Sequence, residues 1–238
     1  MNVSLVIPAY NESENLPRLI DACLQALEPI AGSHEILIVE DGSTDDSPDV
    51  LSRLEATVPI LRSIRHERGR NIGCHPSELE GFEAAQGDVA LFLPADLQVH
   101  PSTLSQFLEA AEGSDIVASR RLKRADNALR RLLARVNNVV ERVVMGIDVR
   151  DAHSAMLVTR RALDDIVPEV RSRSALIPAE LLYRARERGL SITEIDVRHD
   201  RRIAGRQTGA TIAEIAKVQL DLLRLRLRLV GERRAARS

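Results

Sequence analysis

Short apolar runs alternate with helically spaced apolar residues along the first 118 residues of this chain. Between the runs, Leu16, Leu19, Ile20 and Leu27 share one helical face, and later segments repeat that spacing. Strands that alternate with helices pack as a mostly parallel sheet with helices on both faces, joined by right-handed crossovers. The sequence therefore predicts an α/β fold. The predicted strands are Val3–Ile7, Glu35–Val39, Ile60–Ile64, Val89–Leu93 and Ile116–Ala118.

The pattern changes after Arg121, which places a soft boundary near residue 122. Residues 127 to 145 read as one long amphipathic helix with many arginines. The chain has 238 residues, enough for one large α/β domain. The elements expected after this helix are a strand over Ala155–Val158, a helix over Glu180–Arg188, a strand over Ile192–Val197, a polar loop over 201–211 and a last helix over 212–230.

Polar motifs follow three of the predicted strands at the point where each strand ends. In open α/β sheets, ligands bind outside the carboxyl ends of the strands. A carboxylate at that edge indicates a site for metal and phosphate. Asn11 and Glu14, three residues apart, also have the spacing of a helix capping box. The motifs are Pro8-Ala-Tyr-Asn-Glu12, Glu40-Asp-Gly-Ser43 and Ala95-Asp-Leu-Gln98.

In this order, the three motifs resemble those of the family-2 glycosyltransferases. The segments Asp115–Val117, Asp151–Leu157 and Glu180–Ala185 are similar to the dolichol-phosphate mannose synthase branch, which acts on polyprenyl phosphates. The resemblance spans roughly residues 2 to 210. It implies a GT-A, Rossmann-like fold and transfer of a sugar, with inversion, from a nucleotide diphosphate sugar. It also implies help from Mg²⁺ or Mn²⁺.

The resemblance assigns the donor pocket to the first two motifs. Pro8, Tyr10 and Glu12 would line the nucleotide pocket, and Asp41 would contact the base or the ribose. Tyr10 offers a flat apolar face with a polar tip, which suits a nucleoside. The implied divisions are residues 1–122 as the nucleotide-sugar-binding half, 123–210 as the acceptor-binding half of the same domain, and 211–238 as a C-terminal helix with a basic tail.

The third motif departs from the family pattern at one position. The family usually has Asp-x-Asp here, and this chain has Pro94-Ala-Asp96. Asp96, with Gln98 beside it, remains the candidate catalytic and metal-binding pair, because Mg²⁺ often takes only one or two carboxylates plus substrate phosphates and water. The open alternatives are a weakened metal site, a changed nucleotide preference, or a metal-independent enzyme.

Arginines are the residues that the resemblance assigns to the acceptor. Arg121, Arg131 (or the adjacent Arg130) and Arg202 would hold a phosphate, which guanidinium groups bind bidentately. A phosphate oxygen is already anionic and requires no strong base, whereas a hydroxyl acceptor would require one, and Asp151 is then the candidate.

Other family residues of this half are missing. Gln207 and Thr208 replace a Ser-Lys pair, and Ser154-Ala-Met-Leu157 lacks an arginine. Two alternatives therefore stay open. One is the same fold acting on a soluble small-molecule or nucleoside hydroxyl, and the other is a non-catalytic nucleotide-binding relative.

Composition and charge bound the location and the partners. A net charge of −2 argues against nucleic-acid binding. With two cysteines, no signal peptide and no run of 18 apolar residues, we expect a cytoplasmic protein. The last predicted helix carries an apolar stripe beside several arginines, so it can lie on the inner face of an anionic membrane. It can equally pack on the domain or on a second copy in a homodimer.

Overall fold

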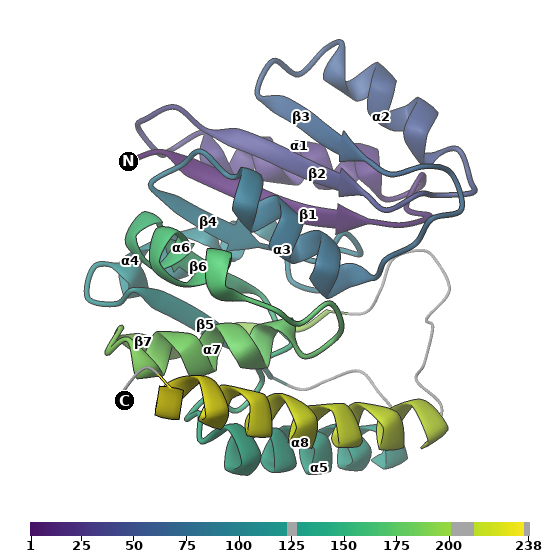
Figure 1. Ribbon diagram of the computed structural model, residues 1–238. Helices are drawn as coiled ribbons and strands as arrows, with labels where there is room; N and C mark the ends of the chain where they lie inside the picture. Colours follow the sequence, from purple (N-terminus) through teal and green to yellow (C-terminus); the bar gives the residue numbers. More distant parts are fainter. Residues whose placement is uncertain (123–127, 201–211, 236–238) are drawn as a thin grey trace.

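The computed structural model of the protein (Figure 1) describes residues 1–122, 128–200 and 212–235. In the helical segments 128–145 and 212–235, side chains are described only for residues 136, 138–145 and 218–232. The strands are β1 (Val3–Ala9), β2 (Glu35–Glu40), β3 (Leu61–Arg65), β4 (Val89–Phe92), β5 (Ile116–Leu122), β6 (Met156–Thr159) and β7 (Ile192–Arg198). The helices are α1 (Leu16–Leu27), α2 (Ser47–Glu55), α3 (Cys74–Ala84), α4 (Leu104–Ala111), α5 (Ala128–Met145), α6 (Arg160–Ile166), α7 (Ile177–Glu187) and α8 (Ile212–Ala235), with short 3₁₀ turns at Pro101–Thr103 and Val167–Glu169.

The strands form one sheet in the order β3-β2-β1-β4-β6-β5-β7. β6 is antiparallel to both of its neighbours, and the other pairings are parallel. Met156 of β6 lies opposite Phe92 on one side and Ala118 on the other. The prediction of a mostly parallel α/β sheet is confirmed, with one reversed strand near its middle. Because β6 and β7 complete the sheet that β1 to β5 begin, the boundary near residue 122 does not separate two sheets.

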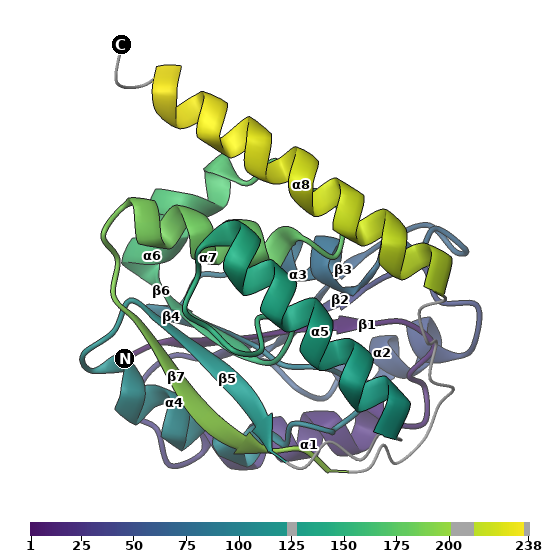
Figure 2. The same cartoon turned by 90° about the horizontal axis from the view of Figure 1, so that it is seen from below.

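Two apolar cores lie on opposite faces of the sheet (Figures 1 and 2). Leu5 and Ile7 of β1 pack with α1, α2 and α4, while Val6 between them points to the face covered by α3, α6 and α7. Successive strand residues point to opposite faces, so one strand feeds both cores. α3 approaches β1 closely at Gly81, where an added Cβ would lie 2.2 Å from Val6 Cγ1. α5 and α8 lie side by side outside α7.

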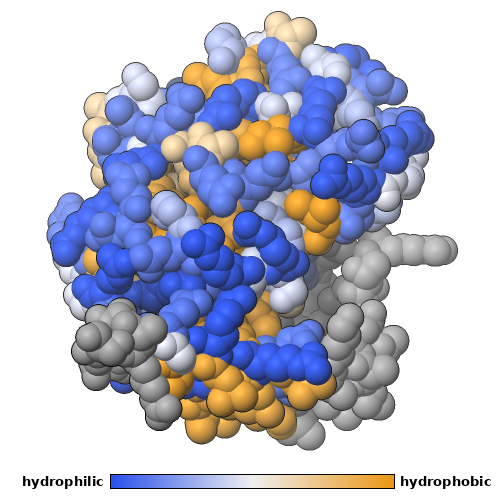
Figure 3. Space-filling model, in the orientation of Figure 1, coloured by the Kyte–Doolittle hydropathy of each residue, from blue (hydrophilic) through white to orange (hydrophobic). Residues whose placement is uncertain are grey.

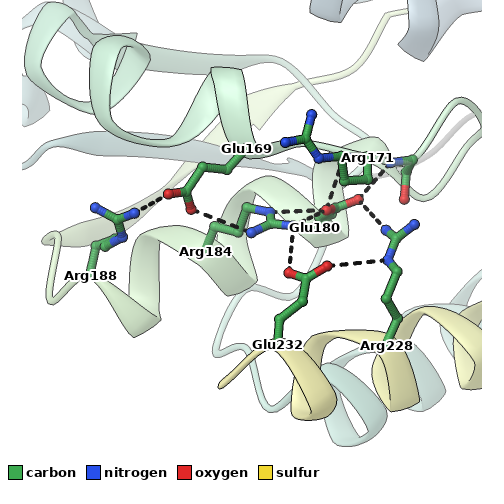
Figure 4. A network of polar contacts seen from close by, with 8 residues as sticks. Glu169, Arg171, Glu180, Arg184, Arg188, Arg228 and Glu232 are labelled. Carbon is green, nitrogen blue, oxygen red and sulfur yellow. Dashed lines mark hydrogen bonds and ion pairs between the residues drawn. The ribbon is translucent and has the colours of Figure 1, made fainter. Parts of the chain in front are cut away.

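A buried ionic network fastens α8 to α7 (Figure 4). Glu180 of α7 is 0% exposed, and Arg184 binds its Oε1 through Nε at 2.9 Å and Nη2 at 2.7 Å. From α8, Arg228 Nη2 reaches Glu180 Oε2 at 3.2 Å, and Glu232 Oε2 accepts from Arg184 Nη2 at 3.1 Å. A buried charge is tolerated only when it is paired and hydrogen-bonded. The network therefore fixes where α8 sits.

The first loop differs from the prediction in two ways. β1 continues through Pro8 to Ala9. The backbone nitrogen of Pro8 points toward β4, which has already ended at this level: the last hydrogen bond between the two strands runs from Leu93 N to the Val6 carbonyl at 3.0 Å. A proline without an N–H is tolerated at such a position. The predicted capping box is wrong. α1 begins at Leu16, and Asn11 instead caps the turn after β2.

Candidate functional site

The three polar motifs meet at one edge of the sheet. β2, β1 and β4 are parallel neighbours, and their carboxyl ends lie together. Asp41 N donates to the Ala9 carbonyl at 2.9 Å, which joins the first two loops at their bases. The chain continues from β1 to β2 on one side and returns as β4 on the other, so the crevice between β1 and β4 is a topological switch point. Ligands of open α/β sheets bind at such points.

The loop after β1 is held by the loop after β2. Asn11 N donates to Ser43 Oγ at 2.9 Å, and Asn11 Oδ1 accepts from Thr44 N at 2.8 Å. Glu12 is buried against this loop, while Tyr10 is 39% exposed. The tyrosine ring is thus available to a ligand, and the backbone N–H of Glu12 donates to Ser47 Oγ at 2.9 Å.

Asp41 organises the start of α3. Its carboxylate accepts from Ile72 N and Gly73 N, each at 2.8 Å, and contacts His66 Nδ1 at 2.9 Å. Burial alone would lower the pKa of His66, but hydrogen bonds to Asp41 and Glu80 outweigh it and raise that pKa. The contact of Asp41 with a nucleoside stays a prediction, and the structure adds a second task, orientation of the 72–73 turn.

The Asp96–Gln98 turn contains a strained residue. Leu97 has φ +59°, and together with Asn11 (φ +55°) it is one of the two non-glycine residues with positive φ in the described ranges. Such conformations cost about 1–3 kcal/mol and cluster at functional sites. Asp96 is 7% exposed, and its Oδ1 accepts from Gln98 N at 3.0 Å. Both strained residues lie in motifs that the sequence marked as ligand-binding.

Gln98 is also tied to the end of β7. Its Nε2 donates to the Asp200 carbonyl at 3.3 Å, and Asp200 N donates to the Gln98 carbonyl at 2.9 Å. The amide oxygen is the atom that a cation would use. This link joins the Asp96–Gln98 turn to the segment that follows β7.

The donor set at this edge suits a hard cation with few protein ligands. Within the described residues no three His, Cys, Asp or Glu side chains are grouped to hold a metal ion. Asp96 and Asp41 nevertheless lie at the same edge of the sheet, because they follow the carboxyl ends of β4 and β2. One carboxylate and one amide oxygen fit Mg²⁺ or Mn²⁺ that takes its other ligands from water and substrate phosphates.

Arg121 and Asp151, two of the residues predicted for the acceptor half, form an ion pair. Arg121 Nε lies 2.7 Å from Asp151 Oδ2, and Nη2 lies 2.8 Å from Oδ1. Arg121 is the next-to-last residue of β5 and Asp151 precedes β6, so both lie at the same edge as the three motifs. The structure thus brings these two predicted residues together. The side chain of Arg131 and all of Arg202 lie outside the described residues.

Sequence reasoning gave no weight to the histidines at this edge. His66 follows β3, His75 lies in the first turn of α3, and His153 follows Asp151. His75 Nε2 and His153 Nδ1 are 3.2 Å apart. Their position in the sequence, beside predicted strand ends and a helix start, could have indicated these histidines in the same way that it indicated Asp41 and Asp96.

The family model described as glycosyl transferase family 2 matches residues 4–167. The undecaprenyl-phosphate 4-deoxy-4-formamido-L-arabinose transferase of Pectobacterium carotovorum subsp. carotovorum (strain PC1) is 37% identical over 223 residues, which are 93% of this chain and 66% of that protein. The enzyme of the same name from Pseudomonas syringae pv. syringae (strain B728a) is 37% identical over 179 residues, 74% of this chain and 52% of that protein. The chain spans less than two thirds of the length of these relatives.

Solved structures agree on the fold. Glucosyl-3-phosphoglycerate synthase from Mycobacterium tuberculosis, in complex with Mn²⁺, uridine diphosphate and glucosyl-3-phosphoglycerate, superposes with a TM-score of 0.65 at 18% identity, covering 94% of this chain and 79% of that one. Its complex with Mg²⁺ and uridine diphosphate gives the same values. The likeness shows the GT-A fold that the resemblance implied.

Proposed function

Since this chain belongs to glycosyl transferase family 2, we propose that it transfers a sugar from a nucleoside diphosphate sugar to a polyprenyl phosphate, inverting the anomeric carbon. One observation carries the proposal: the loops after β1, β2 and β4 share one edge of the sheet with the Arg121–Asp151 pair. Donor-binding and phosphate-binding groups are therefore adjacent. The names of the related transferases, which specify undecaprenyl phosphate, support this acceptor class.

The proposed reaction depends more on the orientation of the donor and the acceptor than on proton transfer. An acceptor phosphate oxygen attacks the anomeric carbon, the bond from that carbon to the diphosphate breaks, and its electron pair leaves on the diphosphate oxygen. Tyr10 and Glu12 would hold the nucleoside, with Asp41 beside them, while Asp96 and Gln98 would hold Mg²⁺ or Mn²⁺. A divalent cation there neutralises the charge that develops on the leaving diphosphate.

Arg121 is the described arginine best placed to meet the acceptor phosphate. Its contact with Asp151 uses Nε and Nη2, so the Nη1 donors lie outside that pair. Asp151 would orient the guanidinium through its two oxygens. The alternative, a soluble hydroxyl acceptor with Asp151 as the base, would place the proton on an oxygen that already accepts a hydrogen bond from Arg121, and it would weaken that ion pair.

The test is transfer of radiolabelled sugar from nucleoside diphosphate sugars into the organic phase, with undecaprenyl phosphate as acceptor. We expect Arg121→Ala to raise the acceptor KM about ten- to a hundredfold, since a hydrogen bond to a charged group contributes about 1.5–3 kcal/mol. Arg120→Ala is the matched control, because the neighbouring Arg120 pairs with Asp196 on the sheet edge. Label found only in water-soluble product would favour the hydroxyl alternative. Nucleotide binding with no transfer would favour a non-catalytic protein.

The outer face of α5 and α8 is the surface on which we expect membrane contact. Hydrophobic side chains gather there at the lower margin of Figure 3, and α5 and α8 lie side by side. Arg224, whose side chain is 69% exposed, follows Leu223 on α8. Among the described residues, no helix is long and apolar enough to cross a bilayer. The exposed residues are Val136, Val139 and Val143 of α5 and Leu220, Leu223 and Leu227 of α8.

A flotation assay with vesicles containing anionic lipid measures this contact. We expect the wild-type protein to float, and the double variant Leu223→Asp/Leu227→Asp to bind at least tenfold more weakly, because burying one leucine contributes about 1.5–3 kcal/mol. Gln106→Asp adds a charge on α4, on the other face of the sheet, and should float like the wild type. Unchanged flotation of the double variant would contradict the proposal. A wild-type dimer that the double variant abolishes, without vesicle binding, would assign this face to a homodimer.

A further inference from the structure

Four side chains from three segments form a continuous line beside the candidate site. Glu78 Oε2 lies 2.7 Å from His75 Nδ1 in α3. His75 Nε2 lies 3.2 Å from His153 Nδ1, and His153 Nε2 lies 3.0 Å from Glu141 Oε2 of α5. Because of these contacts, every ring nitrogen of both histidines has a partner within the line. The reaction proposed above uses none of these four side chains.

The line requires a definite number of protons. An ionised carboxylate only accepts hydrogen bonds, so His75 Nδ1 and His153 Nε2 each carry a proton. The contact between the two rings needs one more. Two neutral imidazoles hold two protons between them, and this arrangement holds three. With all three contacts hydrogen-bonded and both carboxylates ionised, the pair carries one positive charge between Glu78 and Glu141.

The surroundings favour that charge. The Glu141 side chain is 4% exposed, its Oε1 is buried without a hydrogen-bond partner, and its Oε2 lies 3.0 Å from His153 Nε2. Burial alone would lower the pKa of His153, and the positive charge of Arg121 acts in the same direction. The hydrogen bond to Glu141 and the negative charges of Glu141 and Asp151 outweigh both effects, so the pKa of His153 is raised. The charged groups that face the pair are Glu78 on α3, Glu141 on α5, Asp151 in the same loop and Arg121 on β5.

The pair lies between the two halves of the site. Each polar side chain of segment 151–154 is attached to a different place: Asp151 to Arg121, His153 to His75 and Glu141, and Ser154 Oγ to Ser119 Oγ at 2.7 Å. On the other side, His75 belongs to the first turn of α3, which Asp41 holds through Ile72 and Gly73. His153 and His75 thus connect the acceptor-side segment to the donor pocket.

We propose that His75 and His153 are positioning residues that share one extra proton and thereby hold Asp151 and Arg121 in place for the acceptor. The inference rests on the proposed function for the identity of the acceptor phosphate. When the pH rises and the third proton leaves, the bond between the rings is lost and segment 151–154 loosens. The acceptor KM then increases, while the donor KM and kcat change little.

The proton count is tested first, on the whole protein without substrates, by ¹⁵N chemical shifts of the histidine rings. Between about pH 6.5 and 7 we expect one ring of the pair to have both nitrogens protonated, and the signal to disappear in His153→Gln. Two neutral rings throughout this range would overturn the proposal. This measurement needs no catalysis, so it stands even if the transferase assay fails.

Kinetics then test the positioning role. Above about pH 7.5 the acceptor phosphate is already a dianion, since the second pKa of a phosphate monoester is about 6. We expect the wild-type acceptor KM to rise about tenfold from there to pH 9, whereas His75→Gln and His153→Gln should have a raised KM that no longer depends on pH. His34→Gln, at the opposite edge of the sheet, should keep the wild-type profile. A wild-type profile in both pair variants, with active enzyme, would refute the inference, whereas no product from any form would refute the proposed function alone.

Discussion

Replacing Asp96 with asparagine is expected to lower turnover about a hundredfold or more. A metal ion on a leaving phosphate is worth several kcal/mol, and each 1.36 kcal/mol is a factor of ten in rate. Asparagine keeps the shape of the side chain but removes the charge of the one carboxylate in the Pro94–Gln98 turn. The measurements are the steady-state rate and thermal unfolding with nucleoside diphosphates, with and without Mn²⁺. In Asp96→Asn we expect Mn²⁺ to add nothing to the nucleotide-induced shift.

Two further variants make this result interpretable. Asp165→Asn removes an exposed carboxylate on α6, at the opposite edge of the sheet, and should behave like the wild type. Pro94→Asp restores the usual first aspartate, and we expect it to reach the full Mn²⁺ effect at a lower concentration. A gain in turnover would mean that Pro94 damages a metal site, and a loss would mean that the pocket is adapted to proline. A wild-type rate in Asp96→Asn would remove Asp96 from the reaction.

The second large effect concerns stability. We expect Glu180→Ala to lower the free energy of unfolding by about 3–5 kcal/mol, because removal of one partner leaves buried charges unpaired. Arg184 and Arg228 would lose their shared carboxylate, and Ser172 N would lose the acceptor that it binds at 2.8 Å. Urea denaturation measures the change. Glu83→Gln, which removes a charge from the exposed face of α3, should change stability by less than about 0.5 kcal/mol.

The same carboxylate predicts an acid dependence. Burial by itself raises the pKa of Glu180, but hydrogen bonds from Ser172, Arg171 and Arg184 outweigh it and lower that pKa below 4.5. A depressed folded-state pKa contributes stability above the unfolded value that is lost as the pH falls through the folded value. Wild-type stability should therefore fall below about pH 4.5, and Glu180→Gln should show a shallower decline. Parallel declines in the two proteins would mean that Glu180 does not control this range.

The sequence predicted those features of the fold that depend on local patterns of residues. Buried strands followed by Tyr10, Asp41 and Asp96 placed three loops at one sheet edge, because parallel neighbours share an end. The pairing of strands that are far apart in the sequence could not be predicted from it. The direction of β6 is set by contacts with both β4 and β5, and its four residues have no pattern that distinguishes the two directions.

The same limit applies to the site. Gln98 meets Asp200 across 102 positions, and His75 meets His153 across 78. The capping-box prediction was wrong for a related reason, since Asn11 binds a turn 33 residues away instead of its own helix. Residue types at strand ends gave the chemistry of the site, and only the fold gave its partners.

The reversed strand β6 has a consequence for the order in which the protein can assemble during synthesis. A ribosome that has released residues only up to 122 has made β5 but neither of its neighbours, because β6 and β7 are encoded later. The block β3-β2-β1-β4 already has all of its internal pairings by then. β5 must wait for residues 156–159 to insert beside β4 before it can join that block. The loops after β1, β2 and β4 thus emerge with their strands paired, and the Arg121–Asp151 contact is completed in the same late step that closes the sheet.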